Sequence, residues 1–424
     1  MLESRITSHG APPLSMDVLN RSQPESPYAW LRVIVSLLLS TTGGVGMWSV
    51  VVALPAVQAD FGVARADASF PYTLTMIGFG FGAVLMGRLS DRFGIIVPII
   101  TGAIAISLGY VAAAASQTLW QYALAQGILI GVGSSATFSP LLAHVSLWFT
   151  RRRGIAVAIC ASGNYLAGTL WPPVVAWLIA GWGWRTMSLV VAAVCAVVML
   201  PLAFALRRPA PMSDLTPGTP RGGAAVSAPV PGLSSRALQT LLIIAGFACC
   251  VAMSMPQVHL VAYCVDLGYG PARGAQMLSV MLACGVVSRL AFGFISDRIG
   301  GVRTLLLGSA LQGAALLLFL PFNGLVSLYV VSALFGLFQG GIVPAYAIIV
   351  REHFPAREAG ARVSAVITAT LFGMALGGWM SGAVFDWTGS YRAAFLNGIA
   401  WNLLNLSIAS WLLRRDMARA GAHA

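Results

Sequence analysis

The sequence predicts an all-α membrane protein with twelve transmembrane helices arranged as two similar six-helix bundles. Of its 424 residues, 58% are hydrophobic and only 9% are charged, whereas a soluble domain carries about 25% charged residues. Long apolar stretches follow one another, and about 20 apolar residues suffice for one spanning helix. The segment Gly-Arg-Leu-Ser-Asp-Arg-Phe-Gly at 87–94 also returns as Gly-Phe-Ile-Ser-Asp-Arg-Ile-Gly at 293–300, which indicates an internal duplication.

The first half of the chain contains six apolar stretches, each bounded by charged, Gly or Pro residues. The expected helices cover residues 30–55, 69–87, 95–115, 118–147, 154–181 and 186–206. They form a first bundle, 30–206, that follows a polar tail at 1–29. That tail lacks the basic region and short apolar core of a cleaved signal peptide.

The second half repeats this organisation. Its expected helices cover 238–264, 274–293, 302–321, 324–350, 359–384 and 392–414, which form a second bundle, 238–414, before a short tail at 415–424. Residues 207–237 are rich in Pro, Gly, Ala and Ser, which is the composition of a flexible linker between the two bundles.

The charged residues predict the orientation of the chain. All 25 basic residues are arginine, so a Walker-A phosphate loop, which needs Lys, is excluded. The net charge of +12 does not indicate nucleic acid binding, because the arginines form short clusters between apolar runs. Only Arg65, Arg185, Arg273 and Arg392 fall in the loops opposite to the termini. The positive-inside rule therefore places both termini and the linker in the cytoplasm.

The duplicated segment resembles the signature loop of the major facilitator superfamily, Gly-x-Leu-x-Asp-Arg-x-Gly, which lies between the second and third helices in that family. The second copy falls between the eighth and ninth expected helices, and the resemblance covers about residues 30–414. The basic continuation usual in the first copy is missing, since Ile95 and Ile96 stand there. The resemblance implies a transporter with the two-bundle fold of that family.

Several softer features are similar to the monocarboxylate transporter and oxalate–formate antiporter branch. They are Arg153-Gly154 before the fifth helix, Pro172-Pro173, the stretch Gln257-Val258-His259-Leu260 with Tyr263, Arg289 in the eighth helix, and Phe354-Pro355-Ala356-Arg357. In that branch the arginine of the eighth helix binds the carboxylate of the substrate, and the resemblance implies this role for Arg289.

The duplicated loops are expected to act as a latch between conformational states. Asp91 and Asp297 lie at helix C-termini, where each carboxylate can accept hydrogen bonds from free amides at a neighbouring helix N-terminus. Arg92 and Arg298 can pair with carboxylates of adjacent loops. We expect these contacts to hold the outward-open state and to break on inward opening. The expected gating residues are Gly87, Asp91, Arg92, Gly94, Gly293, Asp297, Arg298 and Gly300.

Arg289 is the most informative single residue, because its surroundings in the sequence are apolar. It precedes Asp297 by eight residues, which places it about 12 Å deeper in the membrane at 1.5 Å per residue. An intramembrane Arg costs at least about 2.5–3.5 kcal/mol, so it normally faces a wet cavity or a partner. All 13 acidic residues fall in loops or at helix ends. An anionic substrate would supply the missing partner, unless Arg289 extends to the cytoplasmic surface.

Other polar or aromatic residues inside the expected helices complete the predicted substrate site. His259 and Tyr263 lie one turn apart on one helix face, and His259 can bind substrate or carry a proton, although a packing role is equally open. Asn164 and Gln339 are buried amides that either line the cavity or tie helices together. Phe138 stands where a Tyr is common in this branch, which suggests a more apolar substrate tail.

The sequence lacks two charged residues of this branch, so it does not determine which ion or molecule is coupled to transport. The lysine that oxalate carriers place in the eleventh helix is missing, and Gly285 replaces the Asp found one turn before the Arg in animal monocarboxylate carriers. We expect a secondary transporter of a small organic anion, most simply a monocarboxylate, working by alternating access without a cofactor or metal. A proton or counter-substrate can be coupled to it, and a monomer in a bacterial inner membrane is expected. The alternatives are an exporter of a neutral drug or metabolite and a non-transporting sensor with the same fold.

Overall fold

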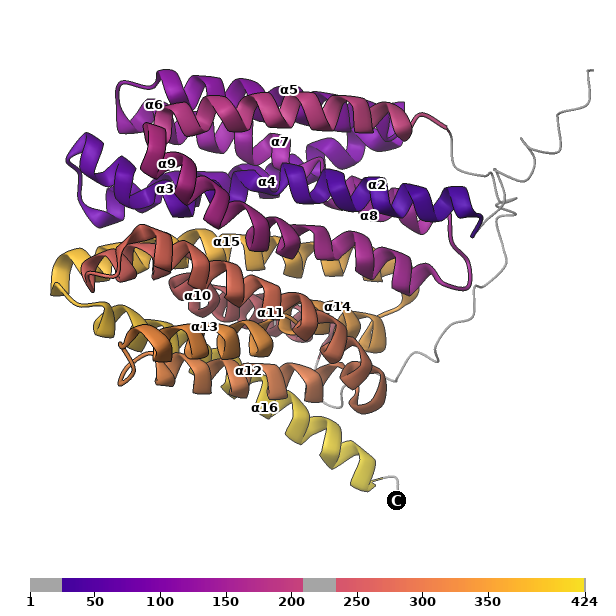
Figure 1. Ribbon diagram of the computed structural model, residues 1–424. Coiled ribbons are helices and arrows are strands. Elements are labelled where there is room, and N and C mark those ends of the chain that lie inside the picture. Colours follow the sequence, from indigo (N-terminus) through magenta and orange to yellow (C-terminus); the bar gives the residue numbers. More distant parts are fainter. Residues whose placement is uncertain (1–24, 209–233, 423–424) are drawn as a thin grey trace, which may run out of the picture.

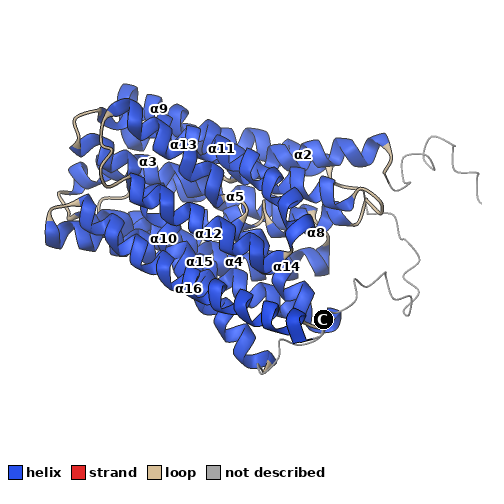
Figure 2. Cartoon of the chain, turned by 90° about the horizontal axis from the view of Figure 1, so that it is seen from below, coloured by secondary structure: helices blue, strands red, loops and turns tan. Residues whose placement is uncertain are grey.

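The computed structural model describes residues 25–208 and 234–422, and every regular element in these two ranges is a helix (Figure 1, Figure 2). Within them, ten helical stretches are long and apolar enough to span a membrane. One of these, α9 (Arg153–Ala205), has 53 residues and is broken at Gly183, where φ is 78°. Counting α9 as two segments and adding α16 (Tyr391–Ala422) accounts for the twelve predicted helices.

The helices follow the predicted order, with additional breaks inside several of them. The first half comprises α2 (Pro27–Gly43), α3 (Val45–Phe61), α4 (Arg65–Phe93), α5 (Ile96–Ala115), α6 (Leu119–Leu124), the π-helix η1 (Ala125–Gly131), α7 (Val132–Ser135), α8 (Ser139–Ser146) and α9. The second half comprises α10 (Ser235–Asp266), α11 (Gly270–Ile299), α12 (Gly301–Leu318), α13 (Leu325–Gln339), α14 (Ile342–His353), α15 (Ala356–Thr388) and α16.

The helix ends differ from the predicted bundle limits where local capping extends a helix. The first helix starts at Pro27 because Ser26 caps it, accepting a hydrogen bond from the amide of Ala29, and Pro is favoured at the first helical position. Ser234 caps α10 in the same way, so this helix begins inside the predicted linker 207–237; residues 209–233 of that linker lie outside the described residues. The predicted tail at 415–424 is helical as far as Ala422, since Ala, Arg and Met favour helix.

The two halves contact each other along pairs of long helices. Helix α4 packs along α15, α9 along α11, and α3 contacts α10 (Figure 1). We call the end that carries the duplicated loops and both described termini the motif end, which lies to the right in Figure 1. We call the other end, where α3 joins α4 and α15 joins α16, the opposite end.

Arg32 ties the first half together at the motif end. Its side chain is buried and donates hydrogen bonds to the carbonyls of Leu206 (2.8 Å) and Arg208 (2.9 Å). It also lies 2.6 Å from Nε2 of His144 and stacks on Trp148, with 4.3 Å from the guanidinium carbon to the ring centre. Arginine donates only, so His144 accepts through Nε2. Both residues therefore have a packing role here.

Glycine allows helix backbones to touch inside each half, as is usual for helix pairs in lipid. A Cβ atom on Gly78 of α4 would lie 1.9 Å from the carbonyl oxygen of Gly127 in η1. A Cβ atom on Gly336 of α13 would lie equally close to the carbonyl oxygen of Met281 in α11. The two halves thus use the same device between equivalent helices.

We predict that Gly78→Ala lowers the thermal unfolding midpoint of the protein in detergent, because the added methyl group must push η1 away from α4. Overpacking of this kind costs typically 1–3 kcal/mol. The matched control is Gly181→Ala, since a Cβ atom at Gly181 meets nothing within 4 Å. Equal midpoints for the two variants would contradict the close α4–η1 contact.

Candidate substrate site and gating motifs

The two copies of the duplicated segment end their helices in the same way. Gly94 ends α4 with φ 80° and ψ 173°, and Gly300 ends α11 with φ 82° and ψ 169°. The amide of each glycine donates to a serine carbonyl, Ser90 and Ser296 respectively, at 2.9 Å. L-residues with a side chain avoid this positive φ, so both positions require glycine. Gly87 and Gly293, in contrast, have free space around them.

The charged residues of these loops point to solvent. Asp91, Arg92, Asp297 and Arg298 are exposed, and within residues 25–208 and 234–422 no ion pair joins Asp91 or Asp297 to another side chain. Arg92 lies over the ring of the adjacent Phe93. The latch predicted for the outward-open state is therefore not formed in this conformation.

Other carboxylates bind the helix N-termini at this end. Both oxygens of Glu352 accept from the amide of Gly301, at 3.1 and 3.3 Å, at the start of α12. Glu25 accepts from the amides of Arg151 and Arg152, at 2.6 and 2.7 Å, at the start of α9. The hydrogen bond from the Arg152 amide holds the pKa of Glu25 below its ordinary value.

Arg289 lies inside α11 and faces α9 of the other half. Its Nη1 donates to the carbonyl of Ala161 at 3.3 Å, and its guanidinium carbon lies 4.6 Å from the ring centre of Tyr165. Its Nε is buried without a hydrogen-bond acceptor. Among the residues that the structure describes, no carboxylate pairs with it. A partly buried cation without a counter-ion is energetically costly, so the geometry leaves Arg289 available to an anion.

Tyr165 occupies the space beside Arg289 that a longer side chain at position 285 would need. A Cβ atom on Gly285 would lie 2.5 Å from the ring of Tyr165. The ring therefore fits only because residue 285 is a glycine. The glycine that replaces the Asp of the branch at position 285 therefore makes room for the ring that supports Arg289.

Phe138 and Gln339 lie at breaks in equivalent helices of the two halves. Phe138 precedes α8 with φ −121° and ψ −83°, and Gln339 ends α13 just before the break at Gly340. Broken helices at membrane depth occur where the backbone is buried in protein or lines a cavity. Pro140 and Pro344 follow these breaks, whereas Pro172 and Pro173 lie within the continuous part of α9.

The two amide residues have different surroundings. Gln339 is buried and accepts from Nε2 of Gln257 at 2.8 Å, while its own Nε2 has no acceptor in the described chain. Asn164 is partly exposed, and its backbone carbonyl accepts from the indole nitrogen of Trp48 at 3.2 Å. Asn164 follows Ala161 by one helical turn, which puts it near the carbonyl that holds Arg289.

His259 and Tyr263 lie toward the opposite end, away from Arg289. His259 is fully buried, with Nε2 at 2.7 Å from the carbonyl of Gly378 in α15 and Nδ1 at 3.4 Å from the hydroxyl of Tyr391. Tyr263 packs against Tyr391 and Phe395 of α16. The structure thus separates the predicted site into one group around Arg289 and another around Tyr391.

An ion-pair network that sequence reasoning missed closes the opposite end. The Nη2 atom of Arg65 lies 3.1 Å from Asp266, and its Nη1 donates to the hydroxyl of Tyr391 at 2.6 Å. The amides of Arg65 and Ala66 donate to the two oxygens of Asp386 at 2.9 and 2.7 Å. All these contacts join the start of α4 to the second half. The charges at these helix ends were visible in the sequence, but their partners across the halves were not.

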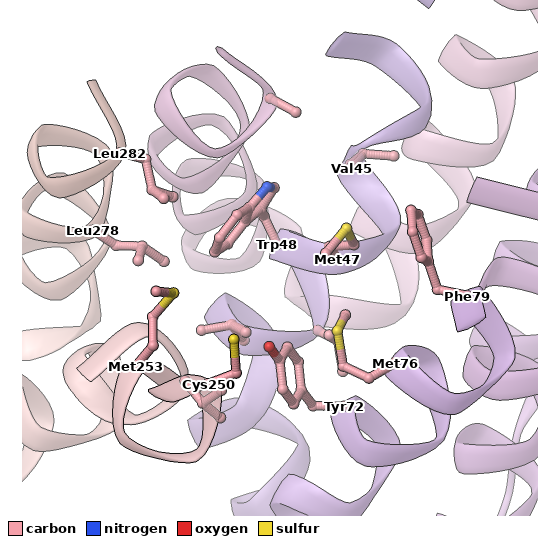
Figure 3. Packing of buried hydrophobic residues seen from close by; sticks show 14 of the residues in the cluster. Val45, Met47, Trp48, Tyr72, Met76, Phe79, Cys250, Met253, Leu278 and Leu282 are labelled. Carbon is pink, nitrogen blue, oxygen red and sulfur yellow. The ribbon is translucent and has the colours of Figure 1, made fainter. Parts of the chain in front are cut away.

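Between this network and the motif end, the two halves meet through apolar side chains (Figure 3). In Figure 3, Trp48 of the first half extends toward Leu278 and Leu282 of α11, and Tyr72 lies beside Cys250 of α10. A Cβ atom on Gly168 would contact both Trp48 and Leu282. Met76, Phe79 and Met253 extend the same buried surface. A ligand held between the halves would meet mostly apolar and aromatic surface.

Two cavities lie elsewhere in the described structure. One, of about 220 Å³, is lined by apolar residues of both halves near the opposite end, Val52, Pro55, Ala56, Ala176, Ile179, Ala180, Val265 and Pro271. The other, of about 210 Å³, lies at the motif end around Gly301 and Glu352. Arg289 lines neither, so the candidate site rests on its side-chain chemistry rather than on these cavities.

Comparison with known proteins identifies the family. The profile of the Major Facilitator Superfamily matches residues 36–327 and 277–423, and the chain belongs to this superfamily. It is 30% identical to Monocarboxylate transporter 13 of Bos taurus over 74% of this chain and 73% of that protein. It is 26% identical to the Agnestins efflux protein AgnL12 of Paecilomyces divaricatus over 67% and 64%.

A solved structure shares the fold. A bacterial homolog of the human lysosomal transporter Spinster superimposes with a TM-score of 0.71 at 14% identity, covering 93% of this chain and 98% of that one. The predicted all-α transporter fold and the likeness to the monocarboxylate transporter branch are thereby confirmed, and the chain is a transporter rather than an enzyme.

Proposed function

We propose that this transporter moves a small organic anion, most simply a monocarboxylate with an apolar tail, by alternating access. The observation that carries the proposal is Arg289, a cation deep in α11 whose Nε has no acceptor and which pairs with no carboxylate of the described chain. A planar guanidinium binds a carboxylate through two parallel hydrogen bonds. The name of the bovine relative supports this substrate class.

The surroundings of Arg289 suggest how such a substrate would lie. Its carboxylate would bind Arg289 over the Tyr165 ring, with Asn164 within reach on the same face of α9. Its tail would contact the apolar surface around Trp48 and Leu282, with Phe138 and Gln339 at the helix breaks as further lining residues.

We further propose a monomer in a bacterial inner membrane with cytoplasmic termini, and coupling to a proton or a counter-substrate.

Export of a neutral compound is the second candidate. The apolar surface between the halves favours it, as does the likeness to a fungal protein named as an efflux protein. A thermal-shift screen of the purified protein against small carboxylates, sugars and neutral aromatic compounds distinguishes the two, because a ligand raises apparent stability by mass action. Stabilisation by neutral compounds alone would overturn the anion proposal.

We predict that Arg289→Lys weakens binding of the best carboxylate about tenfold or more, since one charge-assisted pair contributes roughly 1.5–3 kcal/mol and Lys cannot reproduce the bidentate geometry. Uptake into proteoliposomes as a function of substrate concentration measures this. Arg273→Lys is the matched control, because Arg273 lies near the start of α11 at the opposite end. Unchanged affinity in Arg289→Lys would remove Arg289 from the site.

We predict that Asp91→Asn and Asp297→Asn slow turnover while leaving the substrate affinity nearly unchanged. Both carboxylates are exposed at the motif end, far from Arg289, so they are expected to act on the exchange between states through the outward-open latch. Parallel measurement of equilibrium binding and of exchange rate separates the two effects. A collapsed binding constant with a normal exchange rate would argue against the latch.

We predict that, if transport is coupled to protons through the protein, His259→Gln flattens the pH dependence of uptake, because an imidazole is the side chain in these helices that can exchange a proton most readily. Substrate-for-substrate exchange should persist. The groups that face His259 are the carbonyl of Gly378 and the hydroxyl of Tyr391, and the charges of Arg65 and Asp386 lie nearby. The measurement is uptake into liposomes with an imposed pH gradient, and a wild-type pH profile in the variant would exclude His259 as the proton carrier.

A further inference from the structure

The internal duplication places equivalent charged residues at equivalent helix ends of the two halves. Asp60 lies at the end of α3 and Arg185 just after the break in α9. Asp266 follows Asp60 by 206 residues at the end of α10, and Arg392 follows Arg185 by 207 residues at the start of α16. If both halves kept the same contacts, two equivalent ion pairs would form at the opposite end.

Only the first half forms its pair. Arg185 lies 2.7 Å from Asp60, and its guanidinium stacks on Trp184, with 4.3 Å to the ring centre. In the second half Asp266 pairs instead with Arg65 of the first half at 3.1 Å. The Arg392 side chain is exposed and has no ion-pair partner among the described residues.

Asp266 has changed partner relative to Asp60, and its ion pair with Arg65 joins the two halves. Arg65 is 9% exposed at its side chain, so it is largely withdrawn from water and depends on Asp266 and Tyr391 for its hydrogen bonds. Opening of the opposite end must separate α4 from α10 and α16, and this breaks both contacts. Asp266 would then lose its partner unless another cation is near.

Arg392 meets that requirement. It directly follows Tyr391, the second partner of Arg65, and the ring of Tyr391 lies 5.1 Å from that of Tyr263, one turn before Asp266 on α10. The Asp60–Arg185 pair shows that a carboxylate and an arginine at these two helix ends reach each other inside one bundle.

We propose that Asp266 exchanges partners during the transport cycle. It pairs with Arg65 when the opposite end is closed and with Arg392 when this end is open. The carboxylate then stays paired in both states, and the difference between the two ion pairs helps to set the equilibrium between them. The exchange concerns the motion of the fold and is independent of the substrate proposed above.

The test follows the opening of the opposite end without substrate. Ser69 is buried and faces Gly382 between the halves at this end, so a Ser69→Cys probe reacts with a membrane-impermeant thiol reagent only when this end opens. Five of the six native cysteines are buried, and Cys284→Ser removes the partly exposed one. Labelling rates are measured for single and paired substitutions in this background.

Arg65→Gln is expected to raise the labelling rate, and Arg392→Gln to lower it, each by about fivefold or more, the size of a typical coupling between two states. Arg392→Lys, which keeps the charge, should restore most of the rate. The matched control is Arg185→Gln, which breaks an ion pair inside one half and should leave the rate unchanged.

The decisive comparison is a double-mutant cycle with Asp266→Asn, because residues that interact directly show non-additive effects. Arg392→Gln should have no further effect once Asp266 is neutral. An effect of Arg392→Gln that is the same with Asp266 and with Asn at this position would overturn the exchange, and so would an unchanged labelling rate in Arg392→Gln alone.

Discussion

The high cost of placing a charge in hydrocarbon is the constraint on which the rest of this structure depends. With so few charged residues in the chain, nearly all of them lie at helix ends, where water or an opposite charge is within reach. They form the duplicated loops at one end and the Arg65 network at the other. Ionic contacts can therefore close either end of an alternating-access transporter, while the surface between the two ends is apolar (Figure 3).

Arg289 is the exception, because it lies inside a helix and its surroundings leave its charge without a partner. One carbonyl, of Ala161, and one aromatic ring, of Tyr165, contact the guanidinium, and neither neutralises its charge. Arg32, which is buried in α2, has two carbonyls near the end of α9 and an imidazole as acceptors. Arg32 thus has three hydrogen-bond acceptors inside the protein and belongs to the packing, although its Nε also lacks an acceptor, whereas Arg289 has one acceptor. This difference makes Arg289 the better candidate for binding a ligand.

The sequence predicted the helices well because the bilayer imposes one length and one composition on each of them. It did not predict that His259 lies by Tyr391 rather than by Arg289. Helix periodicity shows which face of its helix a residue occupies, but it does not show which residues of other helices pack against that face. The change of partner by Asp266 was hidden for a related reason, since a repeat predicts equal contacts in both halves and cannot show a contact between them.

The contact between Tyr165 and Gly285 has a consequence for how this site can evolve. Since the Tyr165 ring fills the space of any side chain at position 285, a carboxylate at 285 requires this ring to move away or to be replaced by a smaller side chain. A cationic arginine pocket supported by a ring and an arginine pocket that also holds an acid are then alternative designs separated by two linked substitutions. Replacement of Tyr165 alone would remove the aromatic support of Arg289, so the two kinds of site should seldom interconvert.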